Sequence, residues 1–334
     1  MFNIHRAVAT AMLASAAVHA WSAPQVTSYT GICEASAAVA LDAQRFIVAD
    51  DEHNVLSIYR VGKPKRESTV DLVAYLDTTK SDGEAKKSDI EGAARVKNRI
   101  YWIASHSRDK KGHPEKSRLR FFATDLIGQG SKTRVAIPKT PPYRDLLKDL
   151  TADSRFSAIA DAAANKVGPE KLGGLNVEGL AATPQGHLLI GFRNPRPWGM
   201  ALLAPLQNPG EVIAGAHARF GAPILLDLGK RGIRSIDWVQ NRYIIVAGPY
   251  DDGSSGEGSD FALYGWSGQA SEKPKRWVDA PLATLGPEAM FQIPGTQSIH
   301  LLSDDGDVCA RLKLTGTEMS FRGIVLDLST ARFE

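Results

Sequence analysis

Residues 89–112, DIEGAARVKNRIYWIASHSRDKKG, place a Glu-Gly pair ahead of two short apolar runs and end in a Ser-His pair and a basic loop. Residues 176–194, NVEGLAATPQGHLLIGFRN, repeat the Glu-Gly pair and both runs, with Arg-Asn in place of Ser-His. Gly92 and Gly179 are expected where the chain turns tightly, since glycine tolerates conformations that other residues do not. Recurrence of this kind indicates a repeat architecture.

Three weaker copies lie at residues 33–51, 233–251 and 287–305. The residues at the Glu position of the five copies are Glu34, Glu91, Glu178, Ser235 and Glu288, at steps of 57, 87, 57 and 53 residues. Every copy continues into a third apolar run, and the first four continue into a fourth, at 68–76, 133–138, 222–228 and 275–282. The runs are rich in β-branched and aromatic residues and are separated by turn residues, which is typical of strands.

Four strands per repeat predict an all-β fold, a five-bladed β-propeller. A β-sandwich is the alternative, but it would show similar strands without the repeat. The fifth copy lacks a fourth run, so we expect the N-terminal strand QVTSYTGI, residues 25–32, to close the ring beside the strand that contains residues 324–328 and to remove an exposed edge. Apolar residues at helical spacing predict a helical insertion over about 143–166, between blades two and three.

The N-terminal segment carries the apolar run AVATAMLASAAV, which has the length of a secretion signal. We expect a signal peptide over residues 1–20, or cleavage after Ala23 as the alternative, and one propeller domain over 24–334. The run is shorter than the ~20 residues of a membrane span. We therefore expect a periplasmic or secreted protein with no membrane insertion. The net charge of +3 gives no reason to expect nucleic-acid binding.

Only two cysteines are present, Cys33 and Cys309. In an exported protein they would form one disulfide or remain idle thiols. The proposed closure makes the first and fifth blades neighbours and puts both cysteines on the same face. The sequence therefore predicts a Cys33–Cys309 disulfide.

The two faces of the predicted propeller have different loops. The loops that join the second strand to the third, and one blade to the next, are long, whereas those on the opposite face are short. Long loops in a compact domain are mostly functional or disordered. The repeated acidic residues and the polar ends of the second strands fall on the long-loop face, so we expect the functional site there.

Carboxylates that converge on the axis of a propeller would suit a hard divalent cation such as Ca²⁺. The predicted metal ligands are Glu34, Asp50, Glu91, Glu178, Asp251, Glu288 and Asp304. The alternative is a structural ring in which Arg193 and Arg234 neutralise the glutamates and keep the blades in register.

A basic loop follows the second copy. Arg108 in this loop, with Asn194, Arg234 and Tyr250, is predicted to bind an anionic ligand, although a charge run is also typical of a solvated surface. His106 and Arg193 are the predicted catalytic residues, since histidine acts as a general base near neutral pH. A hydrogen-bonded structural histidine is the alternative. No glycine-rich phosphate loop, HExxH, CxxC or GxSxG motif is present, so we expect no nucleotide cofactor.

These features support two classes of function. The first is a divalent-metal-dependent hydrolase of anionic esters, lactones or phosphoesters. The second is a non-catalytic propeller that binds a ligand or a protein and whose central glutamates are structural. We expect a monomer, with a small anionic molecule or a protein as its partner.

The stretches DIEGAAR…RIYWIASHSRDKKG, GLNVEGLAATPQGHLLIGFRNP, ILLDLGKRGIRSI and IIVAGPYD together resemble the bacterial family known as domain of unknown function 3616. The resemblance covers nearly the whole chain after the signal and implies a β-propeller without a settled activity. More loosely, a Glu-Gly pair followed by a strand that ends in Asp or Ser-His is similar to phytase-like esterase and gluconolactonase-type propellers. That similarity implies acidic residues around a central metal.

Overall fold

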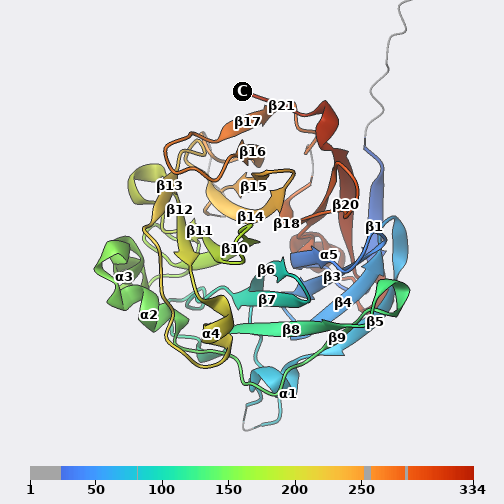
Figure 1. Ribbon diagram of the computed structural model, residues 1–334. Helices are drawn as coiled ribbons and strands as arrows, with labels where there is room; N and C mark the ends of the chain where they lie inside the picture. Colours follow the sequence, from blue (N-terminus) through green and yellow to red (C-terminus); the bar gives the residue numbers. More distant parts are fainter. Residues whose placement is uncertain (1–23, 81, 252–256, 283–284) are drawn as a thin grey trace, which may run out of the picture.

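The computed structural model describes residues 24–80, 82–251, 257–282 and 285–334. Its strands form five antiparallel sheets of four or five strands each, arranged around a common centre (Figure 1). The innermost strand of each sheet lies against the innermost strands of its two neighbours, so these strands close a ring. The all-β prediction is confirmed, and the arrangement is that of a β-propeller. The predicted signal peptide lies outside the described residues and stays a prediction.

The sheets follow one another in chain order, and each is written here from its inner to its outer strand. The first sheet contains β2 (Ala35–Ala40), β3 (Arg45–Asp50), β4 (Val55–Arg60) and β5 (Lys63–Asp71). The second contains β6 (Ile90–Val96), β7 (Arg99–Ala104), β8 (Phe121–Ile127) and β9 (Arg134–Ala136). The third contains β10 (Asn176–Ala182), β11 (Leu188–Asn194), β12 (Ala201–Leu206) and β13 (Ile224–Leu226).

The last two sheets take in the two ends of the described chain. The fourth contains β14 (Gly232–Val239), β15 (Arg242–Gly248), β16 (Ala262–Trp266), β17 (Lys275–Val278) and the C-terminal β21 (Arg332–Phe333). The fifth contains β18 (Pro287–Gln292), β19 (Ser298–Ser303), β20 (Ser320–Asp327) and the N-terminal β1 (Val26–Thr30). The helices are α1 (Val73–Leu76), α2 (Leu146–Ala152), α3 (Ser157–Ala164), α4 (Pro209–Ile213) and α5 (Gly306–Leu312).

The ring is closed by the N-terminal strand, as the sequence predicted. β1 pairs antiparallel with β20 from Val26 opposite Ile324 to Thr30 opposite Ser320. β20 is the strand that the sequence suggested for this pairing, and the paired residues of β20 are 320–324. β21, which was not predicted, pairs with β17 at the outer edge of the fourth sheet, where Trp277 lies opposite Phe333. Paired edges leave fewer free backbone groups for association with other chains.

Apolar side chains fill the space between every pair of adjacent sheets. Five buried clusters lie between the first and second, second and third, third and fourth, fourth and fifth, and fifth and first sheets. Because both faces of a sheet are covered, its central strands are buried along their whole length, as in β3 and β11. This burial explains why the sequence shows continuous apolar runs instead of strict alternation.

Gly92 and Gly179 do not serve tight turns, which corrects the prediction made for them. Both lie inside the innermost strands β6 and β10, next to a shift of register. A Cβ atom on Gly92 would lie 2.7 Å from the Ile103 side chain, and one on Gly179 would lie 2.8 Å from Ile233. The two glycines therefore allow the crowded inner strands to pack closely.

Three segments differ from or refine the predicted strands and loops. Residues 73–76, predicted as strand, form α1. The connection from β12 to β13 contains α4, so the face predicted to carry only short loops also has a long one. Helices α2 and α3 lie within residues 143–166, at the periphery of the ring, and Leu146, Leu150 and Ile159 pack into the cluster between the second and third sheets (Figure 1). In the described part of the chain, no helix is long and apolar enough to cross a bilayer.

The predicted disulfide is confirmed. Cys33, which precedes β2, is bonded to Cys309 in α5, with 6.3 Å between the two Cα atoms. The bond joins the first sheet to the fifth on the face that carries the acidic residues, and both cysteines are buried.

Removal of this disulfide is expected to lower the free energy of unfolding of the protein. The bond closes a loop of 276 residues, and such a cross-link stabilises mainly by restricting the unfolded chain, by about 4 kcal/mol. Urea denaturation of Cys33→Ser/Cys309→Ser beside the oxidised parent protein measures the loss. Equal midpoints for the two proteins would show that β1 alone holds the ring closed.

Candidate functional site

A cavity of about 580 Å³ opens at the centre of the ring, on the side where the innermost strands begin. Polar and charged side chains dominate its wall. The acidic ones are Glu34, Asp51, Glu52, Asp89, Glu91, Glu170, Glu178, Asp251, Glu288, Asp304 and Asp307, and the basic ones are Lys87, Lys110, Arg118, Arg193 and Arg234. Among the described residues, eleven acidic groups thus face five basic ones, an excess of six. Gathering like charges in one cavity costs free energy unless cations neutralise them.

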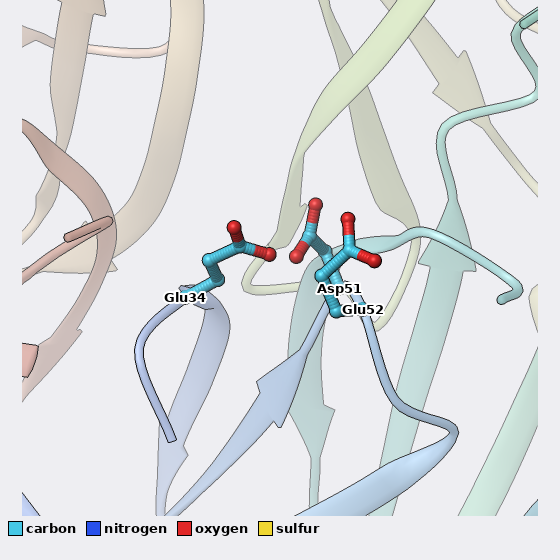
Figure 2. A group of neighbouring side chains, drawn as sticks. All are labelled: Glu34, Asp51 and Glu52. Carbon is cyan, nitrogen blue, oxygen red and sulfur yellow. The ribbon is translucent and has the colours of Figure 1, made fainter. Parts of the chain in front are cut away.

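Five of the acidic residues come together on the side of the first and second sheets, and we call them the acidic half. Glu34, Asp51 and Glu52 form one group, and their carboxylates point toward one another (Figure 2). Asp51, Asp89 and Glu91 form a second. In each group, one carboxylate oxygen from each of the three residues lies within 4.8 Å of those from the other two. Asp51 belongs to both groups and therefore joins them.

The ends of the strands position these side chains. Glu34 directly precedes β2 and forms a β-bridge with Asp304, which follows β19. Asp51 and Glu52 directly follow β3, and Glu91 is the second residue of β6. Asp89 lies just before β6 with φ of 60°, a left-handed conformation that turns the incoming loop into the strand.

Several buried oxygen atoms in the cavity wall have no hydrogen-bond partner within the described chain. They include Oε2 of Glu34 and Oδ1 of Asp51 in the acidic half. The amide oxygen Oδ1 of Asn176 is another, and this side chain is 5% exposed while its Nδ2 donates to Glu178 Oε1 over 2.7 Å. Carboxylate and amide oxygens without donors are the ligands that Ca²⁺ and Mg²⁺ prefer. The donor set therefore fits a hard divalent cation.

Two basic side chains partly neutralise the acidic half. Lys87 Nζ lies 2.5 Å from a carboxylate oxygen of Glu52, 3.3 Å from one of Asp89 and 3.6 Å from one of Asp51. Arg118 Nη1 lies 3.0 Å from Asp89 Oδ2. No hydrogen bond or ion pair reaches the Glu91 carboxylate from the described residues.

On the opposite side of the cavity, arginines neutralise two of the repeated glutamates. Arg234 Nε lies 2.9 Å from Glu178 Oε2, and its Nη2 contacts Glu288. Arg193 Nη1 lies 3.3 Å from Glu178 Oε1. We call these four residues the paired half. The arginine contacts that the structural alternative expects are thus present at Glu178 and Glu288, and the metal hypothesis stays a prediction for Glu34 and Glu91.

The pattern of pairing follows from the fourth repeat. β14 lies between β10 and β18 in the ring, and at its Glu position it carries Ser235. Arg234, one residue earlier, extends to the glutamates of both neighbouring sheets. The repeat that carries Ser235 in place of a glutamate therefore also carries Arg234, the cation that binds the glutamates of the two neighbouring sheets.

The structure does not bring the predicted catalytic histidine to this cavity. His106 is buried and lines a separate cavity of about 120 Å³ between its own loop and helices α2 and α3. Burial lowers the pKa of His106 to about 4, so the ring is neutral at pH 7. Arg108 lines the same small cavity and donates to the carbonyl groups of Gly112 and Ala163. Its role is to fasten the basic loop to α3.

Three further predicted residues lie outside the central cavity. Asp50 accepts hydrogen bonds from the Glu52 amide and from His53, and it faces a different cavity beside the disulfide. Asn194 Nδ2 donates to the Pro169 carbonyl group and holds the loop before β10. The Tyr250 ring stacks against Arg196, whose Cζ atom lies 3.8 Å from the centroid of the ring. Of the other predicted residues, Asp251 and Asp304 do line the central cavity.

Burial changes the acidity of the cavity. It raises the pKa of Glu91, and the nearby charges of Asp89, Glu178 and Asp51 raise it further. Burial, followed by the neighbouring carboxyl of Glu34, raises the pKa of Asp51 well above its usual value. Burial also raises the pKa of Asp304 to about 6. The carboxyl groups of Glu91, Asp51 and Asp304 therefore hold protons more tightly than exposed ones, which is the expected response to burial beside other negative charges.

A pH dependence of stability follows from Asp304. A carboxyl group whose pKa is raised on folding binds its proton more tightly in the folded protein, so stability falls as the pH rises from the unfolded to the folded pKa. For Asp304, with a folded pKa of about 6, that window is roughly pH 4 to 6. The parent protein should therefore lose on the order of 2 kcal/mol relative to Asp304→Asn across it, measured by urea denaturation without divalent cations.

Asp125→Asn is the matched control for this measurement. Asp125 is a partly exposed carboxylate on β8 that pairs with Arg99 away from the cavity. The difference between the parent and this control should show no such loss between pH 4 and 6. The same slope in both variants would mean that Asp304 is not the source of the effect.

The sequence analysis missed several residues that matter in the cavity. Asp89 and Asn176 stand two residues before the repeated glutamates of the second and third copies, so aligning the copies would have found them as a pair. Lys87 and Glu52 had no such signal, because they lie in loops that differ in every copy.

Similarity to solved structures is distant. The PQQ-bound aldose sugar dehydrogenase of Streptomyces coelicolor is 11% identical, with 91% of this chain and all of that chain covered and a TM-score of 0.43. A putative gluconolactonase is 11% identical, with 86% and 72% covered and a TM-score of 0.36. The β-propeller domain of Cps50 (Swd1) from Myceliophteria thermophila is 8% identical, with 88% and 97% covered and a TM-score of 0.38. Likenesses of this size carry no argument about activity.

Sequence comparison identifies a family. No curated protein matches the chain significantly. A family model matches residues 123–298, which span the outer strands of the second sheet, the whole third sheet, most of the fourth and the innermost strand of the fifth, more than half of the chain. The chain therefore belongs to the family described as "Protein of unknown function (DUF3616)".

Proposed function

We propose that this protein is an exported five-bladed β-propeller whose central cavity binds a divalent cation, Ca²⁺ in the first instance, and acts as a metal-dependent hydrolase. Each of the five sheets is then one blade, and the cavity lies where the blades meet. The observation that carries the proposal is the acidic half: two groups of carboxylates that share Asp51, with buried oxygen atoms that no donor in the described chain satisfies.

The charge of the cavity supports a cation as the first ligand. Eleven acidic side chains against five basic ones leave an excess that protons on raised-pKa carboxyls relieve only in part at neutral pH. Glu34, Asp51, Asp89 and Glu91 are the side chains that would hold the ion, with Asn176 as a neutral oxygen in the same cavity wall. Oxygen ligands in this number suit Ca²⁺, which takes six to eight of them (on the order of 2.3–2.6 Å away).

The hydrolytic part of the proposal rests on what a bound cation supplies. A divalent ion polarises an ester, lactone or phosphoryl oxygen and lowers the pKa of bound water. The cavity, at about 580 Å³, is large enough for a small substrate beside the ion. His106 and Arg108 take no part in this version of the site, because they lie in a different cavity.

Calorimetric titration with Ca²⁺, Mg²⁺ and Mn²⁺ tests the cation, and a panel of aryl esters, lactones and aryl phosphates tests the reaction. We expect at least one of the ions to bind with a stoichiometry of one or two and to support turnover that chelation abolishes. Absence of binding at millimolar concentration would refute the cation site. Cation binding without turnover of any substrate in the panel would support the cation site and refute the hydrolase activity.

A non-catalytic binding protein is the second candidate, and the paired half favours it. Glu178 and Glu288 are neutralised by Arg234, as expected of side chains that hold the blades in register. On this hypothesis the cavity binds a small molecule or a partner protein without chemical change. The cation titration followed by the substrate panel separates the two candidates.

A further inference from the structure

Lys87 occupies the centre of the acidic half. Its ammonium group contacts Asp51, which belongs to both carboxylate groups, and also Glu52 from one group and Asp89 from the other. The side chain is 28% exposed and lines the central cavity. In the absence of a metal ion, this ammonium is the cation that contacts both carboxylate groups through Glu52, Asp51 and Asp89, whereas Arg118 contacts Asp89 alone.

A divalent cation in the acidic half would compete with Lys87 for the same oxygen atoms. Both need Asp51, and two positive charges a few ångströms apart repel each other. An ion that carries two charges and takes several oxygen ligands holds Asp51 more strongly than one ammonium group does. Lysine, with a flexible four-carbon stem and three rotatable donors, can move away at small cost.

The cavity offers an anion as the next partner of the displaced ammonium. Lys87, Lys110 and Arg118 all line the central cavity, and Lys87 and Arg118 contact carboxylates of the acidic half. When all five carboxylates of the acidic half are ionised, they outnumber Lys87 and Arg118 by three, and one divalent cation cancels most of this excess. The bound cation then weakens the ion pairs between these carboxylates and the basic side chains. The basic side chains still face the cavity, and an ammonium is a good point-charge ligand for a phosphate or carboxylate group.

We infer that the central cavity binds a divalent cation and an oxyanion together, and that Lys87 passes from Asp51 and Glu52 to the oxyanion when the cation binds. The inference rests on the proposed cation site and adds the substrate class: a molecule that carries a phosphate or carboxylate group. The order of binding is set by charge, since the excess of acidic groups repels an oxyanion until the cation is present. Asn176 lines the same cavity beside Glu178, is 5% exposed and has an amide oxygen without a hydrogen-bond partner in the described chain, and it is the independent sign that the cavity is built for a ligand.

The test is a calorimetric titration of the full-length exported protein with inorganic phosphate, and separately with acetate, in the presence and absence of the cation. Concentrations are kept low enough to avoid precipitation, or Mg²⁺ replaces Ca²⁺. We expect oxyanion affinity to rise about tenfold or more when the cation is present, and cation affinity to rise by the same factor with the oxyanion. Binding of phosphate alone assigns phosphoesters as the class, and binding of acetate alone assigns carboxylates.

Lys87→Met and Lys86→Met form a matched pair. Lys86 is the adjacent lysine, but its ammonium pairs with Glu115 outside the cavity. Lys87→Met should keep or strengthen cation binding and weaken oxyanion binding about tenfold or more, whereas Lys86→Met should change neither.

The outcomes separate this inference from the proposal beneath it. If the parent protein binds no cation, both are overturned. If it binds the cation but oxyanion affinity is the same with and without the ion, the inference alone is overturned, and this arm needs no variant. Oxyanion binding that survives in a folded Lys87→Met protein would likewise exclude Lys87 as its ligand.

Discussion

Asp51→Asn is expected to lower the affinity of the cavity for Ca²⁺ by about 100-fold or more. Asp51 is the only residue shared by the two carboxylate groups of the acidic half within the described chain, so its charge contributes to an ion in either group. Loss of side chains that merely orient metal ligands typically costs about 10–100-fold in affinity, and loss of a shared charged ligand should cost at least that. Calorimetry with the parent and the variant measures the difference.

The variant should fold as well as the parent. Burial and the adjacent Glu34 raise the pKa of Asp51, which means that its ionised form is unfavourable in the metal-free protein. An amide of the same shape removes that cost, so the thermal midpoint without metal should not fall. Ca²⁺ should raise the midpoint of the parent but not that of Asp51→Asn.

Two controls sharpen this prediction. Glu52→Gln alters a carboxylate that belongs to one group and is half exposed, so the affinity should fall less than in Asp51→Asn. Asp125→Asn changes a carboxylate paired with Arg99 away from the cavity and should leave Ca²⁺ binding intact. Parent-like affinity in Asp51→Asn would mean that any bound cation lies elsewhere in the protein.

The fold was predictable because every copy of the repeat uses residue types that are typical of the local structure it forms. Apolar strands, turn residues and Glu-Gly pairs recur in each copy, and both faces of every sheet are buried, so the copies must look alike. The short strand β21 had no such signal, because two residues are too few to form a pattern. Helix α1 was missed because Val73–Leu76 continues an apolar run that also suits a strand.

The site was predicted only in part, and the error at Asp50 shows why. Successive side chains of a strand point to opposite sides, so an offset of one residue moves a carboxylate from the cavity to the far side. Asp50 ends β3 and turns to His53, whereas Asp51 turns to the cavity. His106 was misplaced for a related reason: the loop that carries it packs against α2 and α3, and no local pattern in the sequence encodes that contact.

The division of the cavity into two halves could not be predicted either. The sequence places four glutamates and two arginines near the axis, but the reach of a long arginine side chain decides which acids are neutralised. Arg234 extends to Glu178 and Glu288 and leaves Glu34 and Glu91 without an arginine partner in the described chain. The arginine contacts of the structural-ring hypothesis are thus present at Glu178 and Glu288, and the metal-ligand hypothesis stays a prediction for Glu34 and Glu91.

Arg234→Met is expected to lower the free energy of unfolding by about 3–5 kcal/mol. Arg234, Glu178 and Glu288 are all largely buried, and Arg234 is 5% exposed. Removing one partner of a buried ion pair leaves uncompensated charge in a poorly solvated place, and this costs far more than the pair itself contributes. Urea denaturation at pH 7 measures the loss, and Arg234→Lys should recover only part of it because one ammonium cannot replace the fork of donors.

A double-variant cycle tests whether the loss arises from the buried carboxylates. Glu178 keeps its contact with Arg193 when Arg234 is removed, so Glu288 is the carboxylate left without an arginine. Adding Glu288→Gln to Arg234→Met removes that charge, so the double variant should be more stable than Arg234→Met alone, with a coupling of about 1–3 kcal/mol. Lys230→Met, an exposed change nearby that breaks only a pair with Glu257, should have little effect on stability.

Calcium affinity should stay within about tenfold of the parent in Arg234→Met, since the proposed ion lies in the acidic half. If that variant instead kept its stability and lost Ca²⁺ binding, the roles of the two halves would be reversed: the glutamates of the third and fifth sheets would be the metal ligands, and those of the first and second would hold the ring together.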